Sequence, residues 1–163
     1  METSSKPHNR GLISVLFIFA LLFSIYPLPL EYRWYRPELL TLLLIYWVLA
    51  MPQQFGPLLW FGVGLVQDVV TGSMLGQHAV GTVIIGYLCV LSYQRIRNYS
   101  LWQQACWVFV VCGIAGLLYQ WTNSLRGMSS SGLMFLTPVL ISALSWPLFV
   151  FALDQVRKRF RIR

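Results

Sequence analysis

One stretch determines how this chain folds: Gly64-Leu-Val-Gln-Asp68-Val-Val-Thr-Gly72-Ser-Met-Leu-Gly76, which places a carboxylate in an apolar segment rich in glycine. A charged side chain at membrane depth costs about 3 kcal/mol on insertion scales, so it requires a partner or a function. Glycine lets two helix backbones approach closely. The combination predicts that Asp68 lies at a packed junction between helices, with Gly64, Gly72 and Gly76 at the contacts.

The composition around this stretch is that of a membrane protein. Of the 163 residues, 57% are hydrophobic and 10% are charged, whereas about 25% of the residues of a soluble domain are charged. We expect residues 1–163 to form a single integral membrane domain. It includes two cytoplasmic tails, a short one at residues 1–10 and a basic one at residues 154–163. The net charge of +7 does not indicate nucleic acid, because five of the 12 Lys and Arg residues lie in residues 157–163. Such a cluster is suited to anionic lipid headgroups.

Six apolar segments follow one another along the chain. They are Gly11–Leu30, Leu39–Met51, Leu58–Val70, His78–Tyr93, Leu101–Asn123 and Leu133–Leu153. The second and third are short, because about 13 helical residues extend roughly 20 Å against roughly 30 Å of hydrocarbon. Two arrangements therefore stay open: six membrane-spanning helices, or four with a re-entrant hairpin around residues 52–57. The hairpin's non-helical backbone would need to be covered by protein or water.

The positive charges predict the orientation in the membrane. With the amino terminus inside and an even number of crossings, only Arg33, Arg36 and Arg126 of the 12 basic residues fall on the outer side. Lys and Arg accumulate in cytoplasmic loops. We therefore expect a multi-pass protein with both termini in the cytoplasm.

The sequence contains no set of residues that predicts catalysis. Asp68 has no second acid nearby, and there is no zinc-protease motif, glycine-rich phosphate loop or serine elbow. The spacing of Cys89, Cys106 and Cys112 matches no metal site. We expect no enzymatic activity, no metal and no cofactor.

Three roles stay open for Asp68. It could form a hydrogen-bonded junction within the chain, contact a partner's membrane helix, or serve as a proton or ligand site in a transporter. The last is the weakest, because one acid without a relay of further ionisable groups does not build a transport pathway.

Several short motifs then occur in a characteristic order. They are Arg36-Pro37-Glu38-Leu39-Leu40, Leu43-Leu44-Ile45-Tyr46-Trp47, Gly64-Leu65 with Asp68, Gly72-Ser73 with Leu75-Gly76, and Arg97-Asn98 with Leu101-Trp102-Gln103-Gln104. In this order, and at this chain length, they resemble the bacterial rod shape-determining MreD family. One departure is Glu38, where the family usually has Asp or Asn.

The resemblance implies an all-α polytopic protein of the bacterial inner membrane, with about six transmembrane helices and a fold similar to vitamin-transporter substrate-binding subunits. It implies a non-enzymatic scaffold of the elongation complex that maintains rod shape and helps to organise peptidoglycan synthesis. The expected partners are an MreC-like bitopic protein, the MreB filament, RodA, a class B penicillin-binding protein and membrane lipids. Arg36, Pro37 and Glu38 would join Asp68 and its glycines as partner-binding or structural residues.

Two other functions are compatible with the residues. Asp68 and the vitamin-subunit fold favour a small-molecule-binding subunit of a transporter, by analogy of fold. Arg33, Arg36 and Arg126 would instead suit a lipid-linked cell-wall precursor at the outer headgroups.

Four further glycines either pack this chain's own helices or offer a flat face to a partner: Gly81, Gly86, Gly113 and Gly116. A second copy of the chain could use such a face, so a homodimer is a further candidate assembly.

Overall fold

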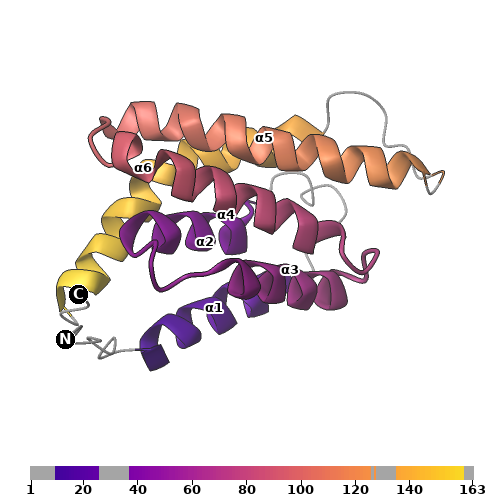
Figure 1. The fold of residues 1–163 in the computed structure, drawn as a ribbon, viewed down its shortest axis with the longest axis horizontal. Helices are drawn as coiled ribbons and strands as arrows, with labels where there is room; N and C mark the ends of the chain where they lie inside the picture. The colour runs from indigo at the N-terminus through magenta and orange to yellow at the C-terminus, as the bar shows by residue number, and fades with distance from the viewer. Residues whose placement is uncertain (1–9, 26–36, 126, 128–134, 160–163) are drawn as a thin grey trace.

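The computed structural model describes residues 10–25, 37–125, 127 and 135–159, and these residues form six α-helices (Figure 1). The helices are α1 (Arg10–Ile25), α2 (Leu39–Ala50), α3 (Pro57–Thr71), α4 (Gln77–Ile96), α5 (Leu101–Leu125) and α6 (Leu136–Arg159). The all-helical fold and the six predicted segments are confirmed. One difference is at the carboxyl end, where α6 continues through Asp154 to Arg159, so that the first part of the expected basic tail is helical.

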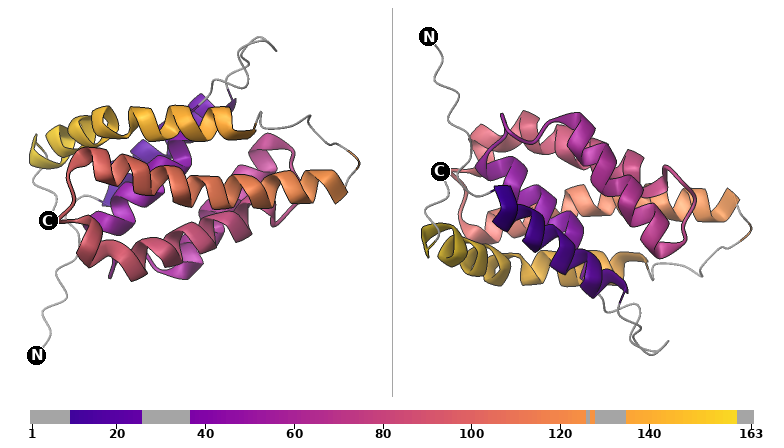
Figure 2. Two further views of the ribbon diagram at one scale, coloured as in Figure 1. Left: turned by 90° about the horizontal axis from the view of Figure 1, so that it is seen from above. Right: turned by 90° about the horizontal axis from the view of Figure 1, so that it is seen from below.

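Three of the helices are long and apolar enough to cross a membrane. They are α4, α5 and α6, with 20, 25 and 24 residues. Figure 2 shows α5 and α6 side by side in both views, and α4 packs along α5. The shorter apolar helices are α1, α2 and α3. The chain is therefore compatible with a multi-pass membrane protein, as predicted.

The short helix α2 lies inside the bundle. Every residue from Leu40 to Val48 is buried, and α2 packs against α1, α4 and α6. A helix that is apolar on all sides is typical of a protein interior. Its 12 residues extend about 18 Å. Because neighbouring helices surround it, this length does not have to match the bilayer.

The helices α3 and α4 form the most extensive pair. The Gly64 backbone lies so close to Ala79 that a Cβ atom at Gly64 would overlap the Ala79 backbone. The Thr82 hydroxyl donates to the Trp60 carbonyl at 2.9 Å, from one helix to the other. The Trp60 ring covers Gly86. Glycine and threonine thus allow the close approach that the sequence predicted for this region.

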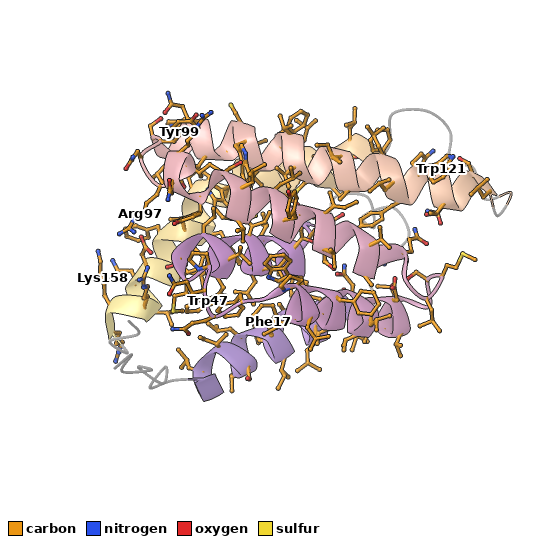
Figure 3. The ribbon with its side chains drawn as sticks, viewed as in Figure 1. Phe17, Trp47, Arg97, Tyr99, Trp121 and Lys158 are labelled. Carbon is orange, nitrogen blue, oxygen red and sulfur yellow. The ribbon has the colours of Figure 1, made fainter. Side chains whose placement is uncertain are left out.

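The two ends of the bundle differ in charge. The start of α1 and the end of α6 lie at one end (Figure 1), where Figure 3 also shows Arg97 and Lys158; Trp121 lies at the other end. The Lys and Arg residues in the described part of the chain all belong to the first of these ends: Arg10, Arg95, Arg97, Arg157, Lys158 and Arg159. We call it the basic end, and the opposite one, which holds the turn between α3 and α4, the distal end. That the basic end faces the cytoplasm stays a prediction.

Candidate functional site

The Asp68 carboxylate is fully buried at the distal end. Its Oδ2 accepts the backbone N–H of Gly76 at 2.8 Å, and its Oδ1 accepts the backbone N–H of His78 at 2.8 Å. The Ser73 hydroxyl donates to Oδ1 at 2.7 Å, and His78 Nδ1 lies 2.8 Å from the same oxygen. Both carboxylate oxygens therefore have hydrogen-bond partners from the chain itself.

These contacts explain how α4 begins. Its N-cap residue, Gly76, has no side chain that could accept a hydrogen bond from the first helical turn. The first backbone N–H groups of a helix lack internal partners and carry partial positive charge. Asp68 supplies the missing acceptor from the preceding helix, so it acts as an N-cap placed ten residues upstream of His78. These contacts have the geometry expected of a hydrogen-bonded junction, the first of the three roles predicted for Asp68, and the choice among the three roles stays a prediction.

The glycines around Asp68 divide into two kinds. Gly64 makes the close contact with α4 described above. Gly72 and Gly76 have open space where a Cβ would be, and they adopt positive φ angles of 64° and 98°. These two residues shape the turn that carries α4 back along α3, because L residues other than glycine rarely adopt such angles. The sequence pattern did not distinguish the two kinds.

Of the further glycines, Gly81 and Gly86 pack inside the chain, against Tyr119 and Trp60. Gly116 faces Phe135. Only Gly113 among these four has nothing within 4 Å of its Cβ position. Of the four glycines expected on a flat face, Gly113 is therefore the one that is open to a partner.

Polar contacts also link the start of α2 to α6. The backbone N–H of Glu38 donates to the Ser142 hydroxyl at 3.0 Å, and the Thr41 hydroxyl donates to the Glu38 carboxylate at 3.0 Å. Pro37, just before them, is half-buried. Arg36 lies outside the described residues, as do Arg33 and Arg126, so the predicted outer cluster of arginines has no described geometry.

The α4 and α5 helices are joined near the distal end, beside Asp68. The His78 and Tyr119 rings lie with their centroids 4.6 Å apart. The Gln77 side-chain amide donates to the Asn123 amide oxygen at 3.4 Å. His78 therefore connects α5 with the carboxylate of Asp68, and the distal end is one continuous polar assembly from α3 to α5.

One polar pair at the basic end was not predicted from the sequence. The Tyr46 hydroxyl donates to the Asp154 carboxylate at 2.6 Å, joining α2 to α6. The two residues are 108 positions apart, and no local pattern connects them. The available signal was a tyrosine in the apolar Leu43–Trp47 run, since a buried tyrosine hydroxyl needs a hydrogen-bond partner.

Within the residues that the structure describes, no three His, Cys, Asp or Glu side chains gather closely enough to hold a metal ion. At the distal end the Asp68 carboxylate is satisfied by donors of the chain itself, whereas the buried side-chain oxygens of Gln67, Gln77 and Tyr119 have no hydrogen-bond partner within the described residues. The Ser73 hydroxyl lies 3.1 Å from His78 Nδ1, and both groups contact Oδ1 of Asp68.

Comparisons with a family model and with a known protein both identify the same family. The family model described as rod shape-determining protein MreD matches residues 6–156. The chain is also 28% identical, over 158 residues and 90% of each chain, to the rod shape-determining protein MreD of Haemophilus influenzae. No solved structure matches the chain. The expected likeness to vitamin-transporter subunits therefore stays a prediction.

Proposed function

The chain belongs to the MreD family of rod shape-determining proteins, multi-pass proteins of the bacterial inner membrane, and on that premise we propose that it is a non-enzymatic scaffold. In this proposal it binds the transmembrane helix of an MreC-like partner. Through that partner it helps to organise peptidoglycan synthesis, in the company of MreB, RodA and a class B penicillin-binding protein.

One observation carries the proposal: several buried polar groups of the described chain, the Asp68 carboxylate foremost, are hydrogen-bonded within the chain itself. Asp68 caps α4, Thr82 bonds Trp60, and Thr41 bonds Glu38. The ligand-binding alternative began from Asp68, and the geometry does not favour it, because four donors or ring atoms already contact that carboxylate. A partner's helix at membrane depth would therefore contact apolar helix surface, at positions where small residues let the two backbones approach closely.

Two helix faces offer such an approach. On α3, Gly62 has open space above it and is flanked by the exposed side chains of Leu58, Val66 and Val69. These positions fall on one side of a helix, because they are separated by three or four residues. The α3 face would let a second helix lie close to the α3 backbone.

The second face is on α5. Gly113 is open in the same way, between the exposed side chains of Val110 and Leu117. A partner's helix or a second copy of this chain would fit either face by the same physical argument.

Co-purification tests the proposal. The tagged chain is co-expressed with the MreC-like protein of the same bacterium, extracted in mild detergent and captured on the tag. We expect the partner to co-elute, and we expect deletion of the chain to abolish rod shape. Absence of co-elution for the wild type, together with unaltered cell shape on deletion, would contradict the proposal.

Two variants then locate the partner face. Because Gly62 and Gly113 have open space around them, Gly62→Leu and Gly113→Leu leave the internal packing of the bundle intact. We expect one of them to reduce co-elution several-fold and the other to leave it unchanged, with the same size-exclusion profile for both. Unchanged co-elution in both would place the contact elsewhere, either on another helix or in the loops.

A further inference from the structure

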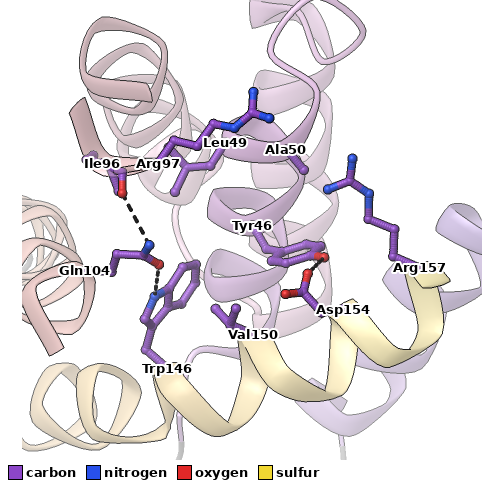
Figure 4. A pocket seen from close by; sticks show the side chains of 10 residues that line it. All are labelled: Tyr46, Leu49, Ala50, Ile96, Arg97, Gln104, Trp146, Val150, Asp154 and Arg157. Carbon is purple, nitrogen blue, oxygen red and sulfur yellow. Dashed lines mark hydrogen bonds between the residues drawn. The ribbon is translucent and has the colours of Figure 1, made fainter. Parts of the chain in front are cut away.

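A pocket of about 250 Å³ opens at the basic end of the bundle (Figure 4). Four helices line it: α2, the end of α4, the start of α5, and α6 from Trp146 to Arg157. Drug-sized ligands occupy pockets of roughly 300–1,000 Å³, so this one suits a smaller chemical group.

The floor of the pocket is held by hydrogen bonds. The Gln104 amide donates to the Ile96 carbonyl at 3.2 Å and accepts the Trp146 indole N–H at 3.3 Å. On the other side, Tyr46 donates to Asp154. These bonds join α4, α5, α6 and α2 around one space, so the pocket is a built feature of the fold.

Two arginines line the pocket. Figure 4 shows the side chains of Arg97, after α4, and Arg157, on α6, with the Tyr46–Asp154 pair between Arg157 and the Trp146 ring. Two guanidinium groups and one carboxylate leave a net charge of +1 on the lining. The carboxylate accepts the Tyr46 hydroxyl, and the Arg157 guanidinium group also contacts that hydroxyl, so a ligand would use the further N–H donors of this guanidinium group. An anion placed between the two guanidinium groups is therefore electrostatically favoured.

The walls below the arginines are apolar. Leu49 and Val150 line them beside the Trp146 ring. A ligand that suits this site carries an anionic group at one end and an apolar portion next to it. Guanidinium groups bind phosphate with paired hydrogen bonds. Basic pockets between transmembrane helices at the headgroup level are suited to anionic lipids.

We propose that this pocket binds the phosphate headgroup of an anionic phospholipid, with Arg97 and Arg157 holding the phosphate and the apolar walls receiving the start of the acyl chains. The proposal does not depend on the scaffold function, since it rests on the pocket alone.

Native mass spectrometry of the delipidated protein tests the proposal. The protein is mixed with phosphatidylglycerol or with phosphatidylcholine, at about 150 mM salt so that long-range attraction is screened. We expect bound phosphatidylglycerol and little phosphatidylcholine on the wild type. Equal binding of the two lipids would overturn the proposal, and so would the absence of any bound phosphatidylglycerol.

A matched pair of double variants assigns the site. Arg97→Gln with Arg157→Gln removes two positive charges from the pocket. Arg95→Gln with Lys158→Gln removes two charges from exposed positions at the same end, outside the lining. We expect the pocket variant to lose phosphatidylglycerol affinity by about tenfold, as for the loss of charge-assisted hydrogen bonds, and the control by less than about twofold. Equal losses in the two variants would show that the attraction belongs to the whole basic end and would overturn the proposal.

Two further measurements keep the result decisive. Arg97 is exposed, so Arg97→Gln alone leaves the fold intact and should still weaken lipid binding if the double variant proves unstable. Inorganic phosphate serves as the second ligand in a thermal-shift assay. If phosphate alone stabilises the wild type as strongly as phosphatidylglycerol does, the site takes free phosphate, and the lipid assignment is wrong.

Discussion

The carboxylate of Asp68, on α3, accepts the backbone N–H of His78, in the first turn of α4, at 2.8 Å. The end of one helix thereby caps the start of the next, and the cap also holds the intervening turn through Gly76 and Ser73. A charge that is expensive at membrane depth becomes stabilising here, because it meets the positive end of a helix and a set of ready donors.

Asp68→Ala should destabilise the bundle strongly. It leaves the backbone N–H groups of Gly76 and His78 without their acceptor in a buried site, and we expect a loss of about 3 kcal/mol. Asp68→Asn keeps one oxygen acceptor and should lose less. Thermal unfolding in detergent, followed by circular dichroism, measures the order. A melting temperature for Asp68→Ala equal to that of wild type would contradict the capping role.

Asp154→Ala is the matched acid control for cell shape. Asp154 is half-buried and accepts the Tyr46 hydroxyl, whereas Asp68 is fully buried. We expect Asp68→Ala to impair rod shape more than Asp154→Ala in a complementation assay. Equal growth and shape in both strains would refute the prediction.

Gly64→Ala should be far more damaging than Gly62→Ala, two residues earlier on the same helix. The added methyl group overlaps the Ala79 backbone at Gly64 and meets open space at Gly62. We expect the first variant to lose a few kcal/mol of stability, as overpacking does, and the second to change it by less than about 1 kcal/mol. Similar unfolding curves for the two variants would show that α3 and α4 do not approach as closely as described.

Gly72→Ala should be destabilised by backbone strain and not by packing. The φ angle of 64° at this residue is left-handed, and no atom lies within 4 Å of the added methyl group. The cost should be about 1–2 kcal/mol, and Gly72→Asn should recover part of it, because Asn adopts this conformation more readily. If Asn is no better than Ala in the same unfolding assay, strain is not the cause.

Tyr46→Phe should weaken the connection between α2 and α6. The change removes only the hydroxyl that donates to Asp154, and we expect a loss of about 1 kcal/mol. Tyr93→Phe is the control, since the Tyr93 hydroxyl accepts only an exposed bond from Gln94 among the contacts described for it. Equal effects of the two substitutions on the unfolding midpoint would argue against a stabilising role for the Tyr46–Asp154 pair.

Hydropathy was sufficient to predict the six helices, since charged residues, glycine or proline separate each apolar run from the next. It could not predict that α2 is the central helix. A side chain that faces lipid and one that faces another helix are both apolar, so composition does not separate them. Only the all-round apolar character of Leu40–Val48 hinted at burial.

The sequence indicated Asp68 as the central residue of the candidate site, but it did not indicate which groups contact Asp68. A lone acid among glycines predicted a packed junction, and in the structure Asp68 is buried and hydrogen-bonded to the first turn of α4. Its donors are set by the turn between α3 and α4, which depends on the φ angles of Gly72 and Gly76. The pair of Tyr46 and Asp154 depends on tertiary packing across most of the chain, which no local pattern encodes.

The central position of α2 has a consequence for biogenesis. This helix emerges early in synthesis, yet two of its anchoring contacts, from Glu38 to Ser142 and from Tyr46 to Asp154, wait for residues 104 and 108 positions later. Until α6 has entered the membrane, the nascent chain holds a helix too short to cross the bilayer alone, with its buried hydroxyl groups facing lipid. The helix α6 therefore completes the enclosure of α2, and a nascent chain that has not yet reached α6 lacks both of these contacts.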